Sequence, residues 1–314
     1  MRQSFIKCLI ELAVADERIV LLTGDLGYSV LEPFRDRFPV RFFNVGVAEQ
    51  NMIGVATGLA EAGLLPFVYS IATFATLRAY EFIRNGLILH RLPVRVVGTG
   101  GGFEYGQCGL THHGLEDVGV MRIQKGITVV VPADRQQAET ALRSTWNLSG
   151  PIYYRVGKDE NTIVPGLEGR YELGRAHTIC EGEDVLFVVM GSIASDVVSS
   201  VTTLNDRGVS CKVMVVASMN PSPIDDLLVA LKRFRLVISV ETHYSVGGLG
   251  SLLAEIIADN GIGCKLIRCG VDSIPDGISG SQAYFHAKHG LLPAQLTETV
   301  MKEWRVVEEG GFCR

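Results

Sequence analysis

Short runs of β-branched and other apolar residues alternate with amphipathic segments along most of the chain. In the first half, such runs predict buried strands at residues 19–23, 41–45, 66–69, 94–98, 128–131 and 152–155. Apolar residues that recur every three to four positions predict helices between them, at residues 5–14, 49–62, 74–90 and 134–148. Because strands and helices alternate, we expect a parallel, doubly wound sheet with helices on both faces.

The same alternation restarts after a charged stretch rich in turn residues, 157–174. Strands are then predicted at residues 185–190, 211–216, 236–241 and 264–269, with helices near 194–206, 224–233, 249–260 and 293–304. The sequence thus predicts an α/β protein with two doubly wound domains. We place the first domain at residues 1–160, a linker at 161–176 and a second, smaller domain at 177–314.

Composition narrows the class of protein. The chain has 314 residues and a net charge of −5 without a basic stripe, so nucleic acid is not expected as a partner. It has no run of 18 or more apolar residues that would predict a membrane span, and residues 1–14 lack the apolar core of a signal peptide. The seven cysteines are scattered, with no metal-ligand spacing. We therefore expect a soluble cytoplasmic protein that supplies no metal site, and the Gly/Ala-rich helices favour an oligomer.

A single acidic residue, Glu49, stands at the head of one of the most apolar predicted helices. One interpretation is that its carboxylate complements the positive end of that helix. The other is a buried acid that carries a proton near neutral pH, because desolvation disfavours its charged form, and that hydrogen-bonds a ring nitrogen. Spacing alone leaves both interpretations open.

Two further features bear on this choice. Phe74 opens a predicted helix 25 residues after Glu49, and a flat aromatic beside a carboxylate would suit a heteroaromatic ring, although a lone Phe is usually core. Six glycines in the twelve residues 98–109 form a loop after a strand, where backbone can approach a ligand closely. His112 and His113 follow this loop, and adjacent side chains cannot share one apolar face. At least one of these histidines is therefore expected to be functional.

Together these pieces resemble the C-terminal half of transketolases, which are thiamine diphosphate enzymes. The resemblance rests on the runs GDLG, FFNVGVAEQNMIGVATGLA, PFVYSIATFATLRAYEFIRN, GLTHHGLED and VVVPAD, and it covers nearly the whole chain. It implies a pyrimidine-binding fold in the first domain and a transketolase C-terminal domain in the second. The implied activity is transfer of a two-carbon ketol unit from a ketose, such as a ketose phosphate, to an aldose acceptor.

The resemblance also implies roles for particular residues. Glu49 matches the acid that faces the aminopyrimidine ring of the cofactor, and Phe74 the ring that stacks on it. Ile71 stands three residues earlier, where an aromatic is common, and Asp25 matches an aspartate near the cofactor. His112 matches the histidine that hydrogen-bonds the substrate oxygen at the reacting carbon and moves its proton.

The substrate positions depart from the usual pattern. Arg2, Ser29 and Arg155 match positions that hold a substrate phosphate, and His113 is counted with this set. Relatives that act on ordinary sugar phosphates have Asp where this chain has Cys108, and His where it has Gly100. The first normally recognises a donor hydroxyl and the second helps to bind acceptor and phosphate. We therefore expect a modified sugar, such as a branched, deoxy, nucleotide-linked or sulfonated one.

The largest departure is the absence of the GDG-x(25–30)-N element that binds Mg²⁺ and diphosphate in these enzymes. The resemblance therefore implies a separate N-terminal-half subunit that carries this element and holds the Mg²⁺, in an α2β2 assembly. One alternative is a thiamine diphosphate-dependent 2-oxo acid dehydrogenase or decarboxylase β subunit, or an enzyme like deoxyxylulose phosphate synthase. A further alternative is a non-catalytic, regulatory homologue.

Overall fold

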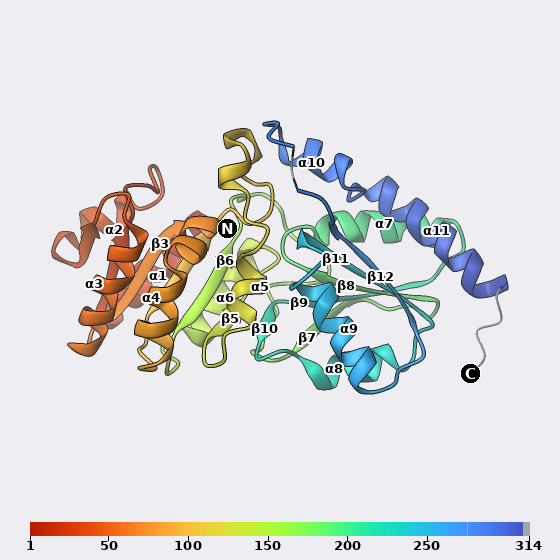
Figure 1. Ribbon diagram of the computed structural model, residues 1–314, viewed down its shortest axis with the longest axis horizontal. Coiled ribbons are helices and arrows are strands. Elements are labelled where there is room, and N and C mark those ends of the chain that lie inside the picture. Colours follow the sequence, from red (N-terminus) through yellow and green to blue (C-terminus); the bar gives the residue numbers. More distant parts are fainter. Residues whose placement is uncertain (275, 310–314) are drawn as a thin grey trace.

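Two β-sheets, one in each half of the chain, organise the molecule and lie side by side along its long axis (Figure 1). The computed structural model describes residues 1–274 and 276–309. The first sheet has the order β10-β5-β6-β4-β3-β1-β2 and the second the order β12-β11-β8-β9-β7. All ten predicted strands are found, and the α/β prediction is confirmed.

The strands of the first sheet are β1 (Ile19–Thr23), β2 (Phe42–Asn44), β3 (Leu65–Ile71), β4 (Arg95–Thr99), β5 (Thr128–Val130), β6 (Ile152–Val156) and β10 (Ser218–Asn220). One face is covered by α1 (Arg2–Ala15), α2 (Glu32–Arg37) and α6 (Arg135–Thr145). The other face is covered by α3 (Glu49–Glu61), the helical stretch 74–88 and α5 (Asp117–Arg122). Parallel β6, β4 and β3 lie at the centre, and β3 is buried along its whole length.

The second sheet consists of β7 (Ala176–Cys180), β8 (Val185–Met190), β9 (Cys211–Val216), β11 (Leu236–Tyr244) and β12 (Lys265–Val271). Helices α7 (Ala194–Asp206) and α11 (Pro293–Glu309) cover one face, and α8 (Ile224–Leu231) and α9 (Leu249–Asp259) the other. The short helix α10 (Gln282–Lys288) precedes α11. None of the helices in the described ranges is long and apolar enough to cross a membrane.

The predicted parallel pairing holds for most strands, but each sheet also has an antiparallel edge strand that was not predicted. Strand β7 pairs antiparallel with β9, and β10 pairs antiparallel with β5 of the first sheet, although β10 belongs to the second half of the chain. The backbone N–H of Val131 also donates to the carbonyl of Ala217 at 2.7 Å. The second half thus contributes an edge strand to the first sheet.

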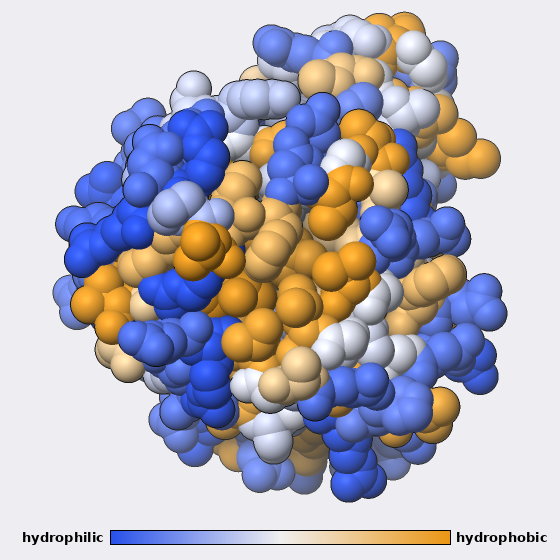
Figure 2. Space-filling model, turned by 90° about the vertical axis from the view of Figure 1, so that its left-hand side faces the viewer, coloured by the Kyte–Doolittle hydropathy of each residue, from blue (hydrophilic) through white to orange (hydrophobic). Residues whose placement is uncertain are grey.

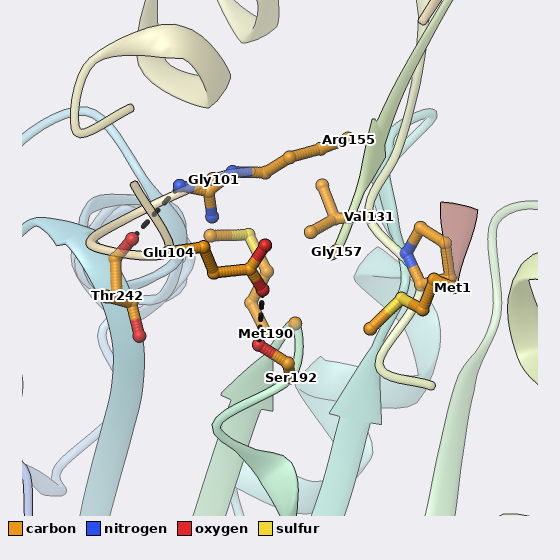
Figure 3. A pocket seen from close by; sticks show the side chains of 11 residues that line it. Met1, Gly101, Glu104, Val131, Arg155, Gly157, Met190, Ser192 and Thr242 are labelled. Carbon is orange, nitrogen blue, oxygen red and sulfur yellow. Dashed lines mark hydrogen bonds between the residues drawn. The ribbon is translucent and has the colours of Figure 1, made fainter. Parts of the chain in front are cut away.

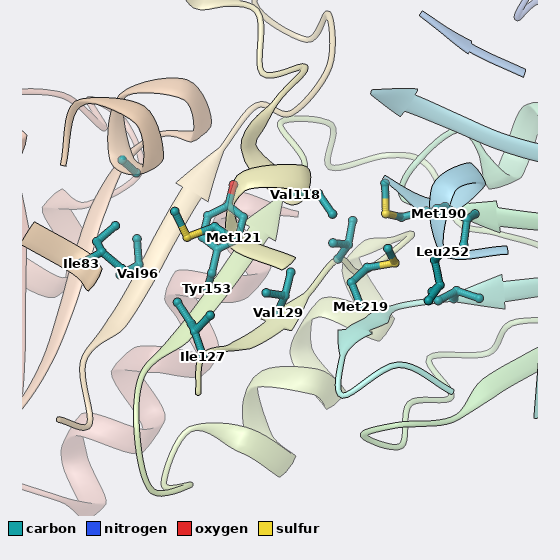
Figure 4. Close-up of a cluster of buried hydrophobic side chains, with 14 of the residues drawn as sticks. Ile83, Val96, Val118, Met121, Ile127, Val129, Tyr153, Met190, Met219 and Leu252 are labelled. Carbon is teal, nitrogen blue, oxygen red and sulfur yellow. The ribbon is translucent and has the colours of Figure 1, made fainter. Parts of the chain in front are cut away.

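The two units share one apolar core. Figure 4 shows Val118 and Val129 of the first unit on one side of this junction, and Met190, Met219 and Leu252 of the second unit on the other. These side chains are almost completely buried. Burial of apolar surface is the main favourable term in packing. The shared core therefore fixes one unit against the other.

The predicted single helix at 74–90 is corrected by the structure. Residues Phe74–Arg78 and Ile83–Ile88 form π-helical turns, with the short α-helix α4 (Tyr80–Phe82) between them. A π turn inserts one extra residue per turn, so the apolar spacing of three to four residues looks helical without showing this irregularity. Such turns occur often at functional sites, and this one carries Phe74.

Candidate active site

Glu49 is the first residue of α3 and lies at the carboxyl end of the central strands. The residue as a whole is 2% exposed, and both carboxylate oxygens accept hydrogen bonds from side chains outside the helix. Ser70 Oγ, near the end of β3, donates to Oε1 at 2.9 Å, and Arg78 Nη1 donates to Oε2 at 3.0 Å. The carboxylate is therefore a buried, oriented acid. It is not an exposed carboxylate at a helix N-terminus.

Phe74 and His112 lie beside this carboxylate, linked to it through Arg78. The Arg78 guanidinium carbon is 3.8 Å from the centre of the Phe74 ring. The His112 ring meets Phe74 edge to face, with ring centres 5.0 Å apart. His112 is half-buried, and its Nδ1 lies 3.0 Å from Thr111 Oγ1. An acid, an aromatic face and an imidazole are thus brought together from three separate segments.

An open hollow of about 620 Å³ gives access to this group. It is lined by Val47, Ala48, Glu49, Gln50, Asn51 and Arg78. In open α/β folds, ligands bind in the crevice at the carboxyl ends of the strands. The hollow occupies that position, because Glu49 follows β2 and Ser70 lies near the carboxyl end of β3.

Asp25 and Ile71 flank the same edge of the sheet. Asp25 follows β1 in the left-handed region, with φ of 58°, and is exposed. Its Oδ1 accepts a hydrogen bond from Asn44 Nδ2 at 2.8 Å, which ties the ends of β1 and β2 together. Ile71 ends β3 and is buried. Both therefore lie close in the fold to Glu49 and Ser70.

Arg155 lies at a different place, in the junction between the two units. Figure 3 shows it with Gly101 and Thr242 at a second cavity, which Glu104 and Ser192 also line. Its Nη2 donates to the carbonyl oxygens of Gly114 at 2.6 Å and Thr242 at 3.0 Å. Its Nε lies 2.9 Å from Asp117 Oδ2 in an ion pair, without the alignment of a hydrogen bond. All of these contacts of the guanidinium are therefore with buried groups of the protein itself.

His113 also points away from Glu49. It is 3% exposed and meets the rings of Phe103 and Phe285 edge to face, with centres 5.1 Å and 4.9 Å apart. Burial lowers the pKa of the His113 imidazole, which favours its neutral form. Of the two adjacent histidines, His112 faces Phe74 and His113 belongs to an aromatic cluster between the units.

The glycine-rich loop packs against the protein's own side chains. Gly100 has φ of +74°, and a Cβ there would lie 2.0 Å from the ring of Tyr105. A Cβ on Gly101 would lie 2.1 Å from Arg155 Nε. The close backbone approach that the sequence indicates is real, but in this part of the chain it serves internal packing. At Gly100, the Tyr105 ring fills the space that a side chain would need.

The remaining predicted substrate residues are spread over this edge of the molecule. Arg2 is half-buried at the start of α1, and Ser29 is exposed with φ of 63°. The Ser29 backbone N–H donates to Glu32 Oε1 at 2.9 Å. Cys108 is an exposed free thiol in the turn Gly106–Cys108. The seventh cysteine, Cys313, lies outside the described residues.

Sequence reasoning missed Ser70, Arg78 and Tyr105. Ser70 is one polar residue in an otherwise apolar strand, which is a weak signal for a buried partner. Arg78 stands four residues after Phe74, a spacing that places two helical side chains side by side. That spacing could have indicated a guanidinium over the aromatic ring.

The chain's own residues fit only part of a thiamine diphosphate site. The buried Glu49 carboxylate and the Phe74 face suit a planar ring that carries a hydrogen-bonding nitrogen. Among residues 1–274 and 276–309, no three His, Cys, Asp or Glu side chains converge in a way that could hold a metal ion. Mg²⁺ at a diphosphate usually takes one or two carboxylates from the protein.

Comparison with known families agrees with this fold. Residues 1–162 match the family model described as the transketolase pyrimidine binding domain, and residues 174–296 match the transketolase C-terminal domain. Together the two models cover more than half of the chain, in the same order as its two units. The chain is thus built of transketolase domains.

Relatives and a solved structure match over nearly the full length. An apulose-4-phosphate transketolase subunit from Phocaeicola vulgatus is 30% identical, with 96% of each chain covered. A 6-deoxy-6-sulfo-D-fructose transketolase subunit from a Clostridium species is 32% identical, with 94% of this chain and 92% of the relative covered. A split-gene transketolase, solved as an inactive β4 tetramer, superposes with a TM-score of 0.87 at 33% identity, covering 96% of this chain and 97% of that one. The chain belongs to the transketolase family.

Proposed function

We propose that this chain is the β-type subunit of a cytoplasmic split transketolase that moves a two-carbon ketol unit from a ketose donor to an aldose acceptor. The observation that carries the proposal is the buried Glu49 carboxylate beside Phe74 and His112. Residues 1–160 would be the pyrimidine-binding domain, 161–176 the linker and 177–314 the C-terminal domain. Both family models support this division.

Each residue of the site has a distinct task in this proposal. Thiamine diphosphate, when bound, supplies the electron sink that a ketol transfer needs. Glu49 holds a proton at its carboxyl and hydrogen-bonds a nitrogen of the pyrimidine ring, while Ser70 orients the carboxyl through Oε1. Phe74 offers its face to the ring. Ile71 and Asp25 border the same crevice.

His112 is the residue of this group that is suited to the substrate. Its ring is held against Phe74 and remains half-exposed, so one imidazole nitrogen can reach a bound sugar. An imidazole exchanges protons readily near neutral pH. We assign it the hydrogen bond to the substrate oxygen at the reacting carbon and the transfer of that proton.

The proposed partner is an N-terminal-half transketolase subunit that carries the GDG…N element and holds Mg²⁺, in an α2β2 assembly. Figure 2 shows a broad apolar area on the end of the molecule that carries α2 and α3. Large apolar side chains are exposed at Val47, which lines the Glu49 hollow, at Val55 of α3, and at Leu77 and Phe82 of the stretch 74–88. A contiguous exposed apolar patch is typical of an interaction site. The relatives named as transketolase subunits support such a partner.

Reconstitution tests this assembly. We expect the chain alone to show no ketol transfer, and activity to appear when the partner subunit, thiamine diphosphate and Mg²⁺ are added. Size-exclusion chromatography with light scattering should then show one complex that contains both chains. Val55→Asp is the disrupting variant. It places a charge on the exposed face of α3 and should prevent assembly while leaving the chain folded. Full activity of the lone chain would contradict the proposal.

The proposed donor is a modified sugar. Cys108 and Gly100 stand where ordinary sugar phosphate enzymes have Asp and His, and the Tyr105 ring fills the space beside Gly100. The names of two relatives, with a branched sugar phosphate and a sulfonated sugar, support a donor outside the common pentose and hexose phosphates. Arg2, Ser29 and the exposed Cys108 are the residues proposed to contact it.

A side-by-side assay tests the donor. We expect the reconstituted enzyme to have a kcat/KM about 100-fold higher for a branched or sulfonated ketose than for xylulose 5-phosphate or fructose 6-phosphate. A hydroxyl of the ordinary donors would lose its carboxylate partner at Cys108, and a hydrogen bond to a charged group is worth about 1.5–3 kcal/mol. Initial rates with each donor and one common aldehyde acceptor provide the measurement. Robust turnover of both ordinary donors would overturn this part of the proposal.

A further inference from the structure

Arg78 occupies the two surfaces that the proposed function assigns to the pyrimidine ring. Its guanidinium carbon lies 3.8 Å above the Phe74 ring centre, which is a stacking distance. The same guanidinium donates from Nη1 to Glu49 Oε2 at 3.0 Å. A flat group that stacks on Phe74 and donates to Glu49 is already present in the subunit itself.

A guanidinium is a close chemical stand-in for an aminopyrimidine. It is planar and delocalised, it carries N–H donors in its plane, and it stacks on aromatic faces. In the structure, the Arg78 guanidinium covers the face of Phe74 and bonds Glu49 Oε2 at the same time. Two planar groups cannot occupy that face and that oxygen at the same time.

We propose that Arg78 is a built-in plug, which closes the pyrimidine site in the free subunit and is displaced when the cofactor binds to the assembled enzyme. This inference rests on the proposed function, because it takes the Glu49–Phe74 site as the pyrimidine site. It adds a regulatory step: the site opens only when Arg78 exchanges places with the ring.

The charges at Glu49 explain why displacement is necessary. The Arg78 guanidinium is the counter-charge of this carboxylate, with Nη1 3.0 Å from Oε2. The role proposed for Glu49 needs a carboxyl that hydrogen-bonds a nitrogen of the ring instead. Glu49 therefore pairs with Arg78 in the closed state, and it can share a proton with a ring nitrogen only after Arg78 has left.

The Arg78 side chain has room to leave the site. Its side chain is 45% exposed and lines the open hollow, whereas the Glu49 side chain is 1% exposed. The long flexible side chain can therefore swing toward solvent or toward the partner subunit without disturbing β3 or α3. Because the pair is half-exposed and the stacking is a single contact, its strength is modest and within reach of a competing ligand.

Cofactor titration of the complex tests the plug. Arg78→Ala should lower the Kd for thiamine diphosphate, at saturating Mg²⁺, by about tenfold, because the competing ion pair and stacking contact are removed. Isothermal titration calorimetry of the reconstituted complex provides the Kd. Arg84→Ala is the matched control, since Arg84 is an exposed arginine of the same helical stretch, and it should leave the Kd unchanged.

The free subunit provides a second readout. There, Arg78→Ala should lower the thermal unfolding midpoint, because Glu49 is left buried without its counter-charge, and Arg78→Ala/Glu49→Gln should restore part of the loss. If Arg78→Ala weakens cofactor binding or leaves it equal to Arg84→Ala, the plug is refuted. If Glu49→Gln does not alter the cofactor Kd at all, the proposed function itself fails.

Discussion

Glu49→Gln should lower the turnover of the reconstituted enzyme by about 10²- to 10⁴-fold, the range of a lost general acid–base group. Glutamine keeps the shape of the side chain and an oxygen that can accept from Ser70 Oγ, but it cannot give and take a proton. Steady-state rates at saturating donor, acceptor and cofactor provide the measurement. The effect should appear in kcat.

The control for this variant lies in the same helix. Glu61, at the far end of α3, is exposed, so Glu61→Gln removes the same charge from the same element without touching the site. It should retain full activity. If Glu49→Gln also retains activity while the complex still assembles, Glu49 is not the acid of this enzyme.

Arg155→Ala should destabilise the chain by about 3–5 kcal/mol, because it leaves the Asp117 carboxylate buried without a counter-charge. Asp117 is 1% exposed, and Tyr153 donates to its Oδ2 at 2.6 Å, which alone does not balance the charge. The variant also removes the two hydrogen bonds to the carbonyls of Gly114 and Thr242. The free energy of unfolding from urea titration provides the measurement.

A second comparison separates this structural role from a substrate role. Arg143→Ala removes an arginine with surface ion pairs to Glu11 and Glu139, and should change the unfolding midpoint little. Arg155→Ala/Asp117→Asn should regain part of the stability lost in the single variant. A rise in KM for the phosphorylated substrate with unchanged stability would show instead that Arg155 holds phosphate.

The strands were predictable because their signal is local. Buried runs such as Val185–Met190 and Cys211–Val216 consist almost entirely of apolar residues, and they form strands with the predicted bounds. Strand β10 has only the residues Ser-Met-Asn, and its pairing with β5 depends on contacts between the two units. A three-residue edge strand of this kind has no periodicity to detect.

The sequence predicted those site residues whose type is unusual for their position in the chain. Glu49, Phe74 and His112 stand out by their surroundings in the sequence, and the structure brings them together. Which oxygen of Glu49 meets Ser70 and which meets Arg78 depends on how β3 packs on α3, and no spacing encodes that.

Buried arginines were harder still. Arginine is almost never fully buried, so a surface role is the default expectation for Arg155. Arg95 also departs from this default. It is 0% exposed and donates to the carbonyls of Trp146 and Gly150. Burial lowers the pKa of Arg95 to about 10. Carbonyl groups that the chain brings in from distant loops satisfy such side chains, and the sequence does not show where those loops lie.

The apolar core that Val118, Val129, Met190 and Met219 share across the junction limits how this protein can move. A hinge motion between the two units would pull these side chains into water and strip β10 from β5. Bending at the segment that connects the units is thus resisted at two places at once. The shared core therefore holds the two units as one body, and the open hollow beside Glu49, which lies wholly in the first unit, needs no hinge motion between them to admit a ligand.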